Sequence, residues 1–210
     1  MEEKDLYAEI SSIRTLMERS TKFISLSGLS GVLAGIYALI GAVIAYNLIT
    51  INNDFKPFSD PDYGQALLIK LVILALVVLV LAISTGVLLT IRKARAKGEN
   101  AWNQSSKLLL RNGILPLITG GIFVIILLIK GFIGVIAPGC LIFYGLSLVA
   151  ASNYTYGDVK WLGIFEIVLG LIAALLPGYG LFFWAAGFGV LHIIYGAVMY
   201  FKYDRENSAG

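Results

Sequence analysis

One glutamate and the single histidine of this chain lie inside long apolar stretches, and their side chains are the best candidates for chemistry. Glu166 belongs to the stretch Trp161–Leu176, and His192 belongs to Leu181–Phe201. The turn Pro177–Gly180 separates the two stretches and is centred between residues 178 and 179. Antiparallel helices joined there would place Glu166 opposite residue 191, one position from His192. We therefore predict that the two side chains touch.

A carboxyl group beside an imidazole can hold and release a proton. An ionised group near the centre of a bilayer costs about 2.5–3.5 kcal/mol on insertion scales, and a partner offsets part of that cost. Such a pair titrates as one unit, and histidine changes charge near neutral pH. One interpretation is a proton-sensing or proton-relay pair, with Tyr144 and Tyr195 extending a polar route. The other interpretation is a hydrogen bond that only holds two helices together.

The elements that must position this pair are membrane helices. The chain is 58% hydrophobic and 14% charged, whereas soluble domains average about 45–50% and about 25%. The run Ala66–Ile91 contains one charged residue, Lys70, and about 20 apolar residues suffice to cross a bilayer. We predict an all-α polytopic membrane protein with six spans arranged as three helical hairpins. The predicted spans are Phe23–Leu48, Ala66–Ile91, Asn112–Ile129, Phe132–Ala151, Trp161–Leu176 and Leu181–Phe201.

The ends of the chain are predicted to lie outside this transmembrane domain, which covers residues 23–201. Residues 1–22 read as an amphipathic cytoplasmic helix, because four apolar residues recur at helical spacing on one face. These residues are Leu6, Ile10, Ile13 and Met17. The helix could pair with a second copy of the chain or dock on the spans. Residues 202–210 are predicted to form a cytoplasmic tail.

Basic residues predict the orientation of the chain. With the N-terminus in the cytoplasm, 13 of the 16 lysines and arginines fall on the cytoplasmic side, as the positive-inside rule requires. Both termini are therefore predicted to be cytoplasmic. The cations Arg92, Lys93, Arg95 and Lys97 could bind anionic lipid headgroups. The loop Asn47–Gln65, which is acidic and contains prolines, is expected on the outer side, as a connector or a vestibule that attracts cations.

Small residues at helical spacing predict where helices approach one another, because helix association in lipid depends on close packing. They occur on spans one, five and six, and the remaining Leu, Ile, Val and Phe faces should meet lipid. The predicted packing residues are Ser27, Gly31, Gly35, Gly163, Gly170, Gly189 and Gly196. Self-association through the N-terminal helix or these glycine-rich spans is a further expectation.

The pattern Trp161-Leu162-Gly163, Gly170, Pro177-Gly178, Gly187, Gly189 and Gly196 resembles one hairpin of the HdeD-like bacterial membrane proteins. The resemblance implies a six-span protein of the bacterial inner membrane with a stress-related role, and it carries over no catalytic residue. Spans four and six also share Ile142–Gly145 and Ile193–Gly196, which fits a hairpin repeat or chance similarity between apolar helices. The long acidic loop and the missing turn proline of the second hairpin depart from the family pattern.

Other kinds of function have little basis in the sequence. One histidine and one cysteine cannot form a metal site of the His and Cys type within one chain, and no phosphate-binding loop occurs. We therefore expect no enzyme activity, no cofactor, no metal and no nucleic-acid partner, but association with the lipid bilayer. The leading interpretation is a non-enzymatic, stress-related membrane protein. The alternatives are a small proton-coupled transporter or channel that uses Glu166 and His192, and an oligomeric adaptor.

Overall fold

The computed structural model describes residues 23, 27–55, 61–96, 98 and 100–204. These residues form helices joined by short turns and contain no strand. The predicted amphipathic helix of residues 1–22 lies outside the described residues. In chain order the elements are α2 Gly28–Phe55, α3 Pro61–Ala96, α4 Gln104–Ile129, η1 Ile133–Val135, α5 Ile136–Ala151, η2 Ser152–Tyr154, α6 Asp158–Leu175, α7 Gly180–Trp184, η3 Ala185–Leu191, α8 His192–Met199 and η4 Tyr200–Asp204.

Five of the helical segments in the described part of the chain are long and apolar enough to cross a membrane. They are Gly28–Thr50, Gly64–Ala96, Gln104–Ile129, Ile133–Tyr154 and Gly180–Asp204. The remaining predicted span corresponds to α6, an 18-residue helix that carries Asp158, Lys160 and Glu166. Two of these charges precede the apolar stretch of α6. These helices fit an integral membrane protein.

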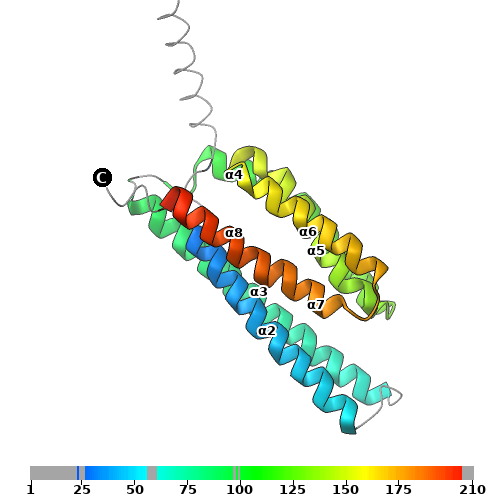
Figure 1. Cartoon of the computed structure of the whole chain (residues 1–210). Helices are drawn as coiled ribbons and strands as arrows, with labels where there is room; N and C mark the ends of the chain where they lie inside the picture. The colour runs from blue at the N-terminus through cyan, green and yellow to red at the C-terminus, as the bar shows by residue number, and fades with distance from the viewer. Residues whose placement is uncertain (1–22, 24–26, 56–60, 97, 99, 205–210) are drawn as a thin grey trace, which may run out of the picture.

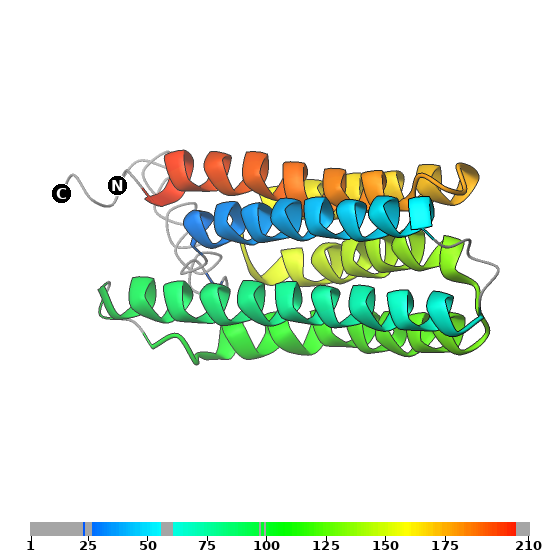
Figure 2. The same ribbon diagram turned by 90° about the horizontal axis from the view of Figure 1, so that it is seen from below.

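The helices form two groups, which can be followed in Figure 1; Figure 2 shows the same helices from below. In one group α2 packs between α3 and the C-terminal helix, which consists of α7, η3, α8 and η4. In the other group α5 packs between α4 and α6. The C-terminal helix joins the groups, because α7 also contacts α5 and α6. The third predicted hairpin is therefore only loosely packed: α6 meets α7 and η3, whereas α8 runs along α2.

Glycines allow the helix backbones to approach one another in both groups. A Cβ at Gly35 would lie 2.6 Å from the carbonyl oxygen of Gly189, and one at Gly31 would lie 3.1 Å from the Cα of Gly196. Between α5 and α6, a Cβ at Gly163 would lie 2.7 Å from the carbonyl oxygen of Gly145. A side chain at these crossings would force the helices apart. Small residues at such positions allow the close packing on which helix association in membranes depends.

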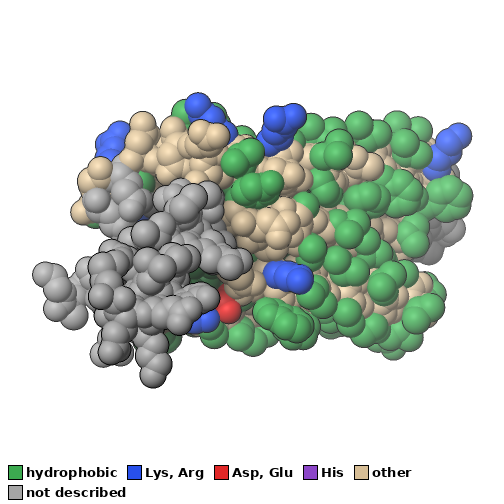
Figure 3. All heavy atoms as spheres, turned by 90° about the horizontal axis from the view of Figure 1, so that it is seen from above, with side chains coloured by type: hydrophobic (Ala, Val, Ile, Leu, Met, Phe, Trp, Pro, Cys, Tyr) green, Lys and Arg blue, Asp and Glu red, His purple; other side chains and the backbone are tan. Residues whose placement is uncertain are grey.

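The outer surface is mostly apolar, as lipid contact requires. Helix α3 contacts α2, and only 6% of its most apolar window is buried. Ile73, Leu76, Val80 and Leu88 are all at least half exposed. Figure 3 shows one face of the molecule with hydrophobic side chains along most of its length and few charged ones.

The helices extend beyond several predicted boundaries. Helix α2 continues to Phe55 and α3 begins at Pro61, so the predicted loop Asn47–Gln65 is wrong at both ends. Proline is favoured at the first position of a helix because its missing N–H needs no partner there. The predicted tail is also wrong at its start, since helical structure continues through Asp204.

The turn between α4 and α5 lies at Lys130 and Gly131, between the predicted spans Asn112–Ile129 and Phe132–Ala151. Gly131 has a φ of +75°, which is easily adopted by glycine. Its N–H donates to the carbonyl of Leu128 at 3.1 Å, and the N–H of Phe132 donates to that of Leu127 at 2.9 Å. These two bonds form a Schellman motif, which ends a helix without a proline.

Candidate functional site

Glu166 lies on α6 with no exposed surface. Its carboxyl group lies against Gly187 of η3, where a Cβ would come within 2.5 Å of Glu166 Oε2 and 2.5 Å of Leu141 Cδ2. Glycine at position 187 therefore makes room for the carboxyl group. Neither carboxyl oxygen accepts a hydrogen bond from any described residue. Buried polar groups are nearly always hydrogen-bonded, so this carboxyl group needs an explanation.

His192 is held from both sides of its ring. Nδ1 lies 3.0 Å from the carbonyl oxygen of Gly187, and Nε2 lies 2.8 Å from the Tyr144 hydroxyl. A carbonyl only accepts, so Nδ1 carries the hydrogen, and in the neutral ring Nε2 accepts from Tyr144. Glu166 Oε1 is 3.4 Å from Nδ1, beyond the usual hydrogen-bond range of about 2.7–3.2 Å. The structure therefore brings Glu166 and His192 together without a hydrogen bond between them.

A local widening of the C-terminal helix precedes His192. Residues Ala185–Leu191 form a π-helix, a rare element that often occurs at functional sites. Gly187, whose carbonyl accepts from the His192 ring, lies in this segment. Phe188 of the same segment packs on the rings of Tyr144 and His192, with centroids 5.1 Å and 6.0 Å apart. The aromatic contacts and the two hydrogen bonds fix the orientation of the imidazole.

The polar side chains continue from this cluster toward one end of the bundle. Tyr195 lies one turn after His192 on α8, and its hydroxyl is buried without a hydrogen-bond partner among the described residues. It is close enough to Tyr144, Asp158 and Tyr203 to interact with them electrostatically. Of the two tyrosines predicted to extend the polar route, Tyr144 contacts His192 directly, and Tyr195 lies between His192 and Tyr203 along the C-terminal helix.

At that end, Asp158 joins α6 to the C-terminal helix. Its carboxylate accepts hydrogen bonds from Lys202 at 2.8 Å and from the Tyr203 hydroxyl at 2.6 Å. Burial disfavours the charge, but these two hydrogen bonds outweigh that effect and lower the pKa of the Asp158 carboxyl. Tyr203 also stacks on Tyr156, with ring centroids 4.0 Å apart.

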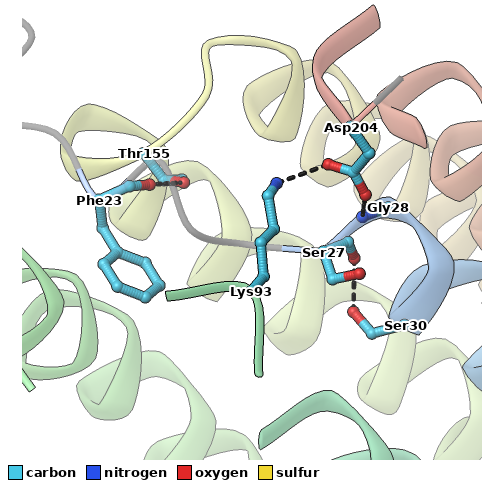
Figure 4. A network of polar contacts seen from close by, with 7 residues as sticks. All are labelled: Phe23, Ser27, Gly28, Ser30, Lys93, Thr155 and Asp204. Carbon is cyan, nitrogen blue, oxygen red and sulfur yellow. Dashed lines mark hydrogen bonds and ion pairs between the residues drawn. The ribbon is translucent and has the colours of Figure 1, made fainter. Parts of the chain in front are cut away.

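A second polar network at the same end connects α2, α3 and the C-terminal helix (Figure 4). Lys93, near the end of α3, lies 2.5 Å from Asp204. The other oxygen of that carboxylate accepts from the backbone N–H of Gly28 at 3.0 Å, where the positive end of the α2 dipole favours an anion. Nearby, Thr155 donates to the carbonyl of Phe23 at 2.9 Å.

The remaining predicted residues have varied positions. Gly31, Gly35, Gly163, Gly170, Gly189 and Gly196 all lie at helix crossings. Ser27 immediately precedes α2, which begins at Gly28, and its carbonyl accepts from the Ser30 side chain at 2.6 Å. Lys93, predicted to meet headgroups, is instead largely buried in the ion pair with Asp204. Arg92 and Arg95 are exposed at the end of α3, and Lys97 lies outside the described residues.

Several residues of the site were not predicted from the sequence. Gly187 is one of many glycines, and only the carboxyl group against it distinguishes its role. Asp204 and Asp158 lie outside the apolar stretches, where a charged residue is ordinary. Among the described residues, no group of three or more His, Cys, Asp and Glu side chains is arranged to hold a metal ion.

Comparison of the chain with models of known protein families, with curated proteins and with solved structures finds no match. The geometry of the site therefore carries the functional argument.

Proposed function

We propose that this integral membrane protein reversibly binds a proton at Glu166, His192 and Tyr144, here called the Glu166 cluster, as part of a small proton-coupled transporter. The observation that carries the proposal is the Glu166 carboxyl group, which is fully buried and accepts no hydrogen bond from the described residues. A purely structural hydrogen bond between helices would engage that carboxyl. Here the Nδ1 of His192 donates to Gly187 instead.

The Glu166 cluster can accept a proton with little movement. If His192 is protonated, Nε2 becomes a donor, and the Tyr144 hydroxyl at 2.8 Å can accept by rotating its own hydrogen away. The resulting imidazolium would have the Glu166 carboxylate 3.4 Å from Nδ1, so opposite charges would stabilise each other in a low-dielectric interior. Alternatively the proton resides on Glu166, and both the carboxyl group and the imidazole are then neutral. These two forms make the cluster a coupled proton site.

Tyr195 and Asp158 provide a direction for proton movement. Tyr195 lies between His192 and Tyr203 along the C-terminal helix, and Asp158, at the start of α6, is hydrogen-bonded to Lys202 and Tyr203 at the end of that helix. Asp158 has a lowered pKa and a side chain that is 28% exposed, so it would release a proton to water readily. We propose that this end faces the cytoplasm, in accordance with the basic residues near it.

A stress-related role of the HdeD-like kind in a bacterial inner membrane is the second candidate. The observation in its favour is that Gly163, Gly170, Gly189 and Gly196, which carry the resemblance, all form close helix contacts. That observation concerns packing and not activity. A proton-responsive cluster is compatible with such a role, whereas an enzymatic mechanism has no support from the site.

The test is an infrared titration of the purified protein in bilayers. A protonated carboxyl has its own C=O stretching band, and the band assigned to Glu166 is the one that Glu166→Gln removes. We expect that band to appear and disappear reversibly with pH. The matched control is Asp158→Asn on the same helix, which should leave the band in place. A carboxyl group that keeps one protonation state at every pH would contradict the proposal.

A further inference from the structure

Two helix crossings in this molecule have the same register. In the crossing of α5 with α6, a Cβ at Gly170 would lie 2.7 Å from Ile142 Cγ1. In the crossing of α2 with the C-terminal helix, a Cβ at Gly35 would lie 2.7 Å from Ile193 Cγ1. Each isoleucine begins a string that ends in tyrosine and glycine, which α5 and α8 share. The shared strings therefore occupy equivalent positions in the two crossings.

The glycines that end these strings also have equivalent contacts. A Cβ at Gly145 would lie 2.5 Å from the carbonyl oxygen of Gly163. A Cβ at Gly196 would lie 2.7 Å from the carbonyl oxygen of Gly28. The partner helix of each crossing thus has two glycines in contact, seven residues apart: Gly163 and Gly170 in α6, and Gly28 and Gly35 in α2.

Helices α3 and α4 carry a third set of related residues. Ile83-Ser84-Thr85-Gly86 of α3 matches the strings of α5 and α8, with threonine in place of tyrosine. Gly121-Ile122-Phe123 of α4 matches Gly35-Ile36-Tyr37 of α2. Applied to these helices, the register of the two formed crossings places Ile83 opposite Gly121. It also places Gly86 opposite Ile118.

This third crossing is open in the structure. Helix α3 packs on α2, whereas α4 packs on α5, and the two helices belong to separate groups (Figure 1). A Cβ added at Gly86 or Gly121 would meet nothing within 4 Å among the described residues. Ile83 and Ile118, the residues expected opposite these glycines, are 56% and 54% exposed. The glycines of the two formed crossings are all buried.

One difference in sequence explains why the third crossing is the weaker one. Where α2 and α6 have the first of their two glycines, α4 has Ile114. A large side chain at this position keeps the two backbones further apart, and close packing is what holds helices together in lipid. The third crossing therefore gains less stability on closing than the other two, and it is able to open.

We propose that α3 and α4 close on each other at Gly86 and Gly121 and separate again, as the two groups of helices move about the C-terminal helix that joins them. Only residues 97–103 separate α3 from α4 in the chain, and consecutive elements usually pack together. In many transporters, one group of helices moves as a rigid body against another to expose a site to either side of the membrane. This movement does not require proton binding at the Glu166 cluster.

The test is disulfide formation between cysteines placed on α3 and α4 of the full-length protein in lipid bilayers, with the native Cys140 replaced by alanine. Oxidation with copper phenanthroline should link Ile83→Cys to Ile118→Cys within one chain, because closure brings their Cα atoms within about 7 Å. The pair Ile142→Cys and Ile167→Cys, at the equivalent positions of the α5–α6 crossing, is the positive reference. Intact-mass spectrometry distinguishes linked single chains from linked dimers.

Two comparisons test the register. Pairing Ile83→Cys with Thr119→Cys turns the second cysteine by about 100° around α4, to another exposed position, and the yield of disulfide should fall several-fold. Adding Gly121→Leu to the pair of Ile83→Cys and Ile118→Cys fills the space that α3 occupies on closing and should also reduce the yield several-fold. Gly134→Leu, which likewise has open space around it but lies outside both helices, should leave the yield unchanged.

Three results would overturn the proposal. The first is an equal yield with cysteine at position 118 or at position 119, and the second is no disulfide between α3 and α4 where the reference pair forms one. The third is a disulfide that joins two chains instead of one, which would assign the exposed face of α3 to a second copy of the protein. The comparison of positions 118 and 119 does not require the leucine variants to fold.

Discussion

Replacing Glu166 with glutamine should not destabilise the protein, although the side chain is fully buried. Glutamine has nearly the same shape as glutamate, and the wild-type carboxyl oxygens accept no hydrogen bond that could be lost among the described residues. The substitution also removes a group whose ionised form is costly inside a membrane. The free energy of unfolding should therefore be unchanged or higher in the variant.

The expected change in the free energy of unfolding of Glu166→Gln differs clearly between a structural ion pair and an unbonded carboxyl group beside a neutral His192. If Glu166 and His192 formed a structural ion pair, removing one partner would lower the free energy of unfolding by about 3–5 kcal/mol. With a neutral His192 and an unbonded carboxyl group, we expect a change between zero and about 2 kcal/mol in the stabilising direction. Residues kept for function commonly cost stability in this way.

Two tyrosine variants calibrate the measurement within the same region. Tyr144→Phe deletes the hydroxyl that lies 2.8 Å from His192 Nε2, and a buried group left without its partner costs about 1–3 kcal/mol. Tyr195→Phe deletes a hydroxyl without a hydrogen-bond partner among the described residues, so its effect should be near zero. The first variant should therefore be destabilised, and the second should not.

The assay is unfolding of the purified protein by sodium dodecyl sulfate in mixed micelles at neutral pH, followed by circular dichroism. All three variants and the wild type are compared under the same lipid and detergent conditions. The reasoning is refuted if Glu166→Gln unfolds as easily as Tyr144→Phe. That result would mean that the carboxyl group makes a stabilising contact and that the pair holds helices together.

Two further predictions concern packing and acid stability. Gly196→Ala should lower the free energy of unfolding by about 1–3 kcal/mol in the same assay, because the new Cβ would lie 2.7 Å from a carbonyl oxygen of α2. Gly121 has open space around it, so Gly121→Ala should leave the free energy of unfolding unchanged. Equal effects of the two variants would contradict the close contact of Gly196 with α2. Hydrogen bonds from Lys202 and Tyr203 lower the pKa of the Asp158 carboxyl in the folded protein. The ionised carboxylate therefore contributes fully to the free energy of unfolding above the unfolded pKa of about 3.9, and this contribution is lost as the pH falls through the folded pKa. Asp158→Asn should therefore reduce the loss of stability on acidification, and an unchanged unfolding profile between about pH 2 and 5 would contradict the assignment.

Much of the secondary structure could be predicted because it follows from local chemistry. Apolar stretches of sufficient length form helices in a bilayer, since every backbone polar group must be satisfied internally. The proximity of Glu166 and His192 also follows from simple counting, because the turn at Pro177 and Gly178 sets the register of the helices on either side. Boundaries were less accurate where polar residues extend a helix, as at Phe55 and Asp204.

The neighbours of each helix could not be predicted from the pattern. Apolar faces are interchangeable in lipid, so nothing in the sequence distinguishes α2 from α6 as the main partner of α8. For the same reason the contribution of Tyr144 from α5 to the His192 site was predicted only as a polar extension. The π-helix at Ala185–Leu191 has no local signal beyond small residues, yet it contains Gly187, which contacts both Glu166 and His192.

The close association of functional and packing roles in the C-terminal helix has a physical reason. Gly189 and Gly196 face α2, while Gly187 and His192 face α5 and α6. One helix therefore contacts both groups of helices and carries the imidazole between them. A proton that changes the charge of the Glu166 cluster would act at the point where the two groups meet.

The central claim, that the buried carboxyl group gains and loses a proton, is tested most directly by the infrared titration of Glu166 in bilayers. The account predicts a carboxyl band that changes reversibly with pH in the wild type and in Asp158→Asn, and that is missing from Glu166→Gln. A wild-type spectrum in which Glu166 contributes no pH-dependent signal would contradict it.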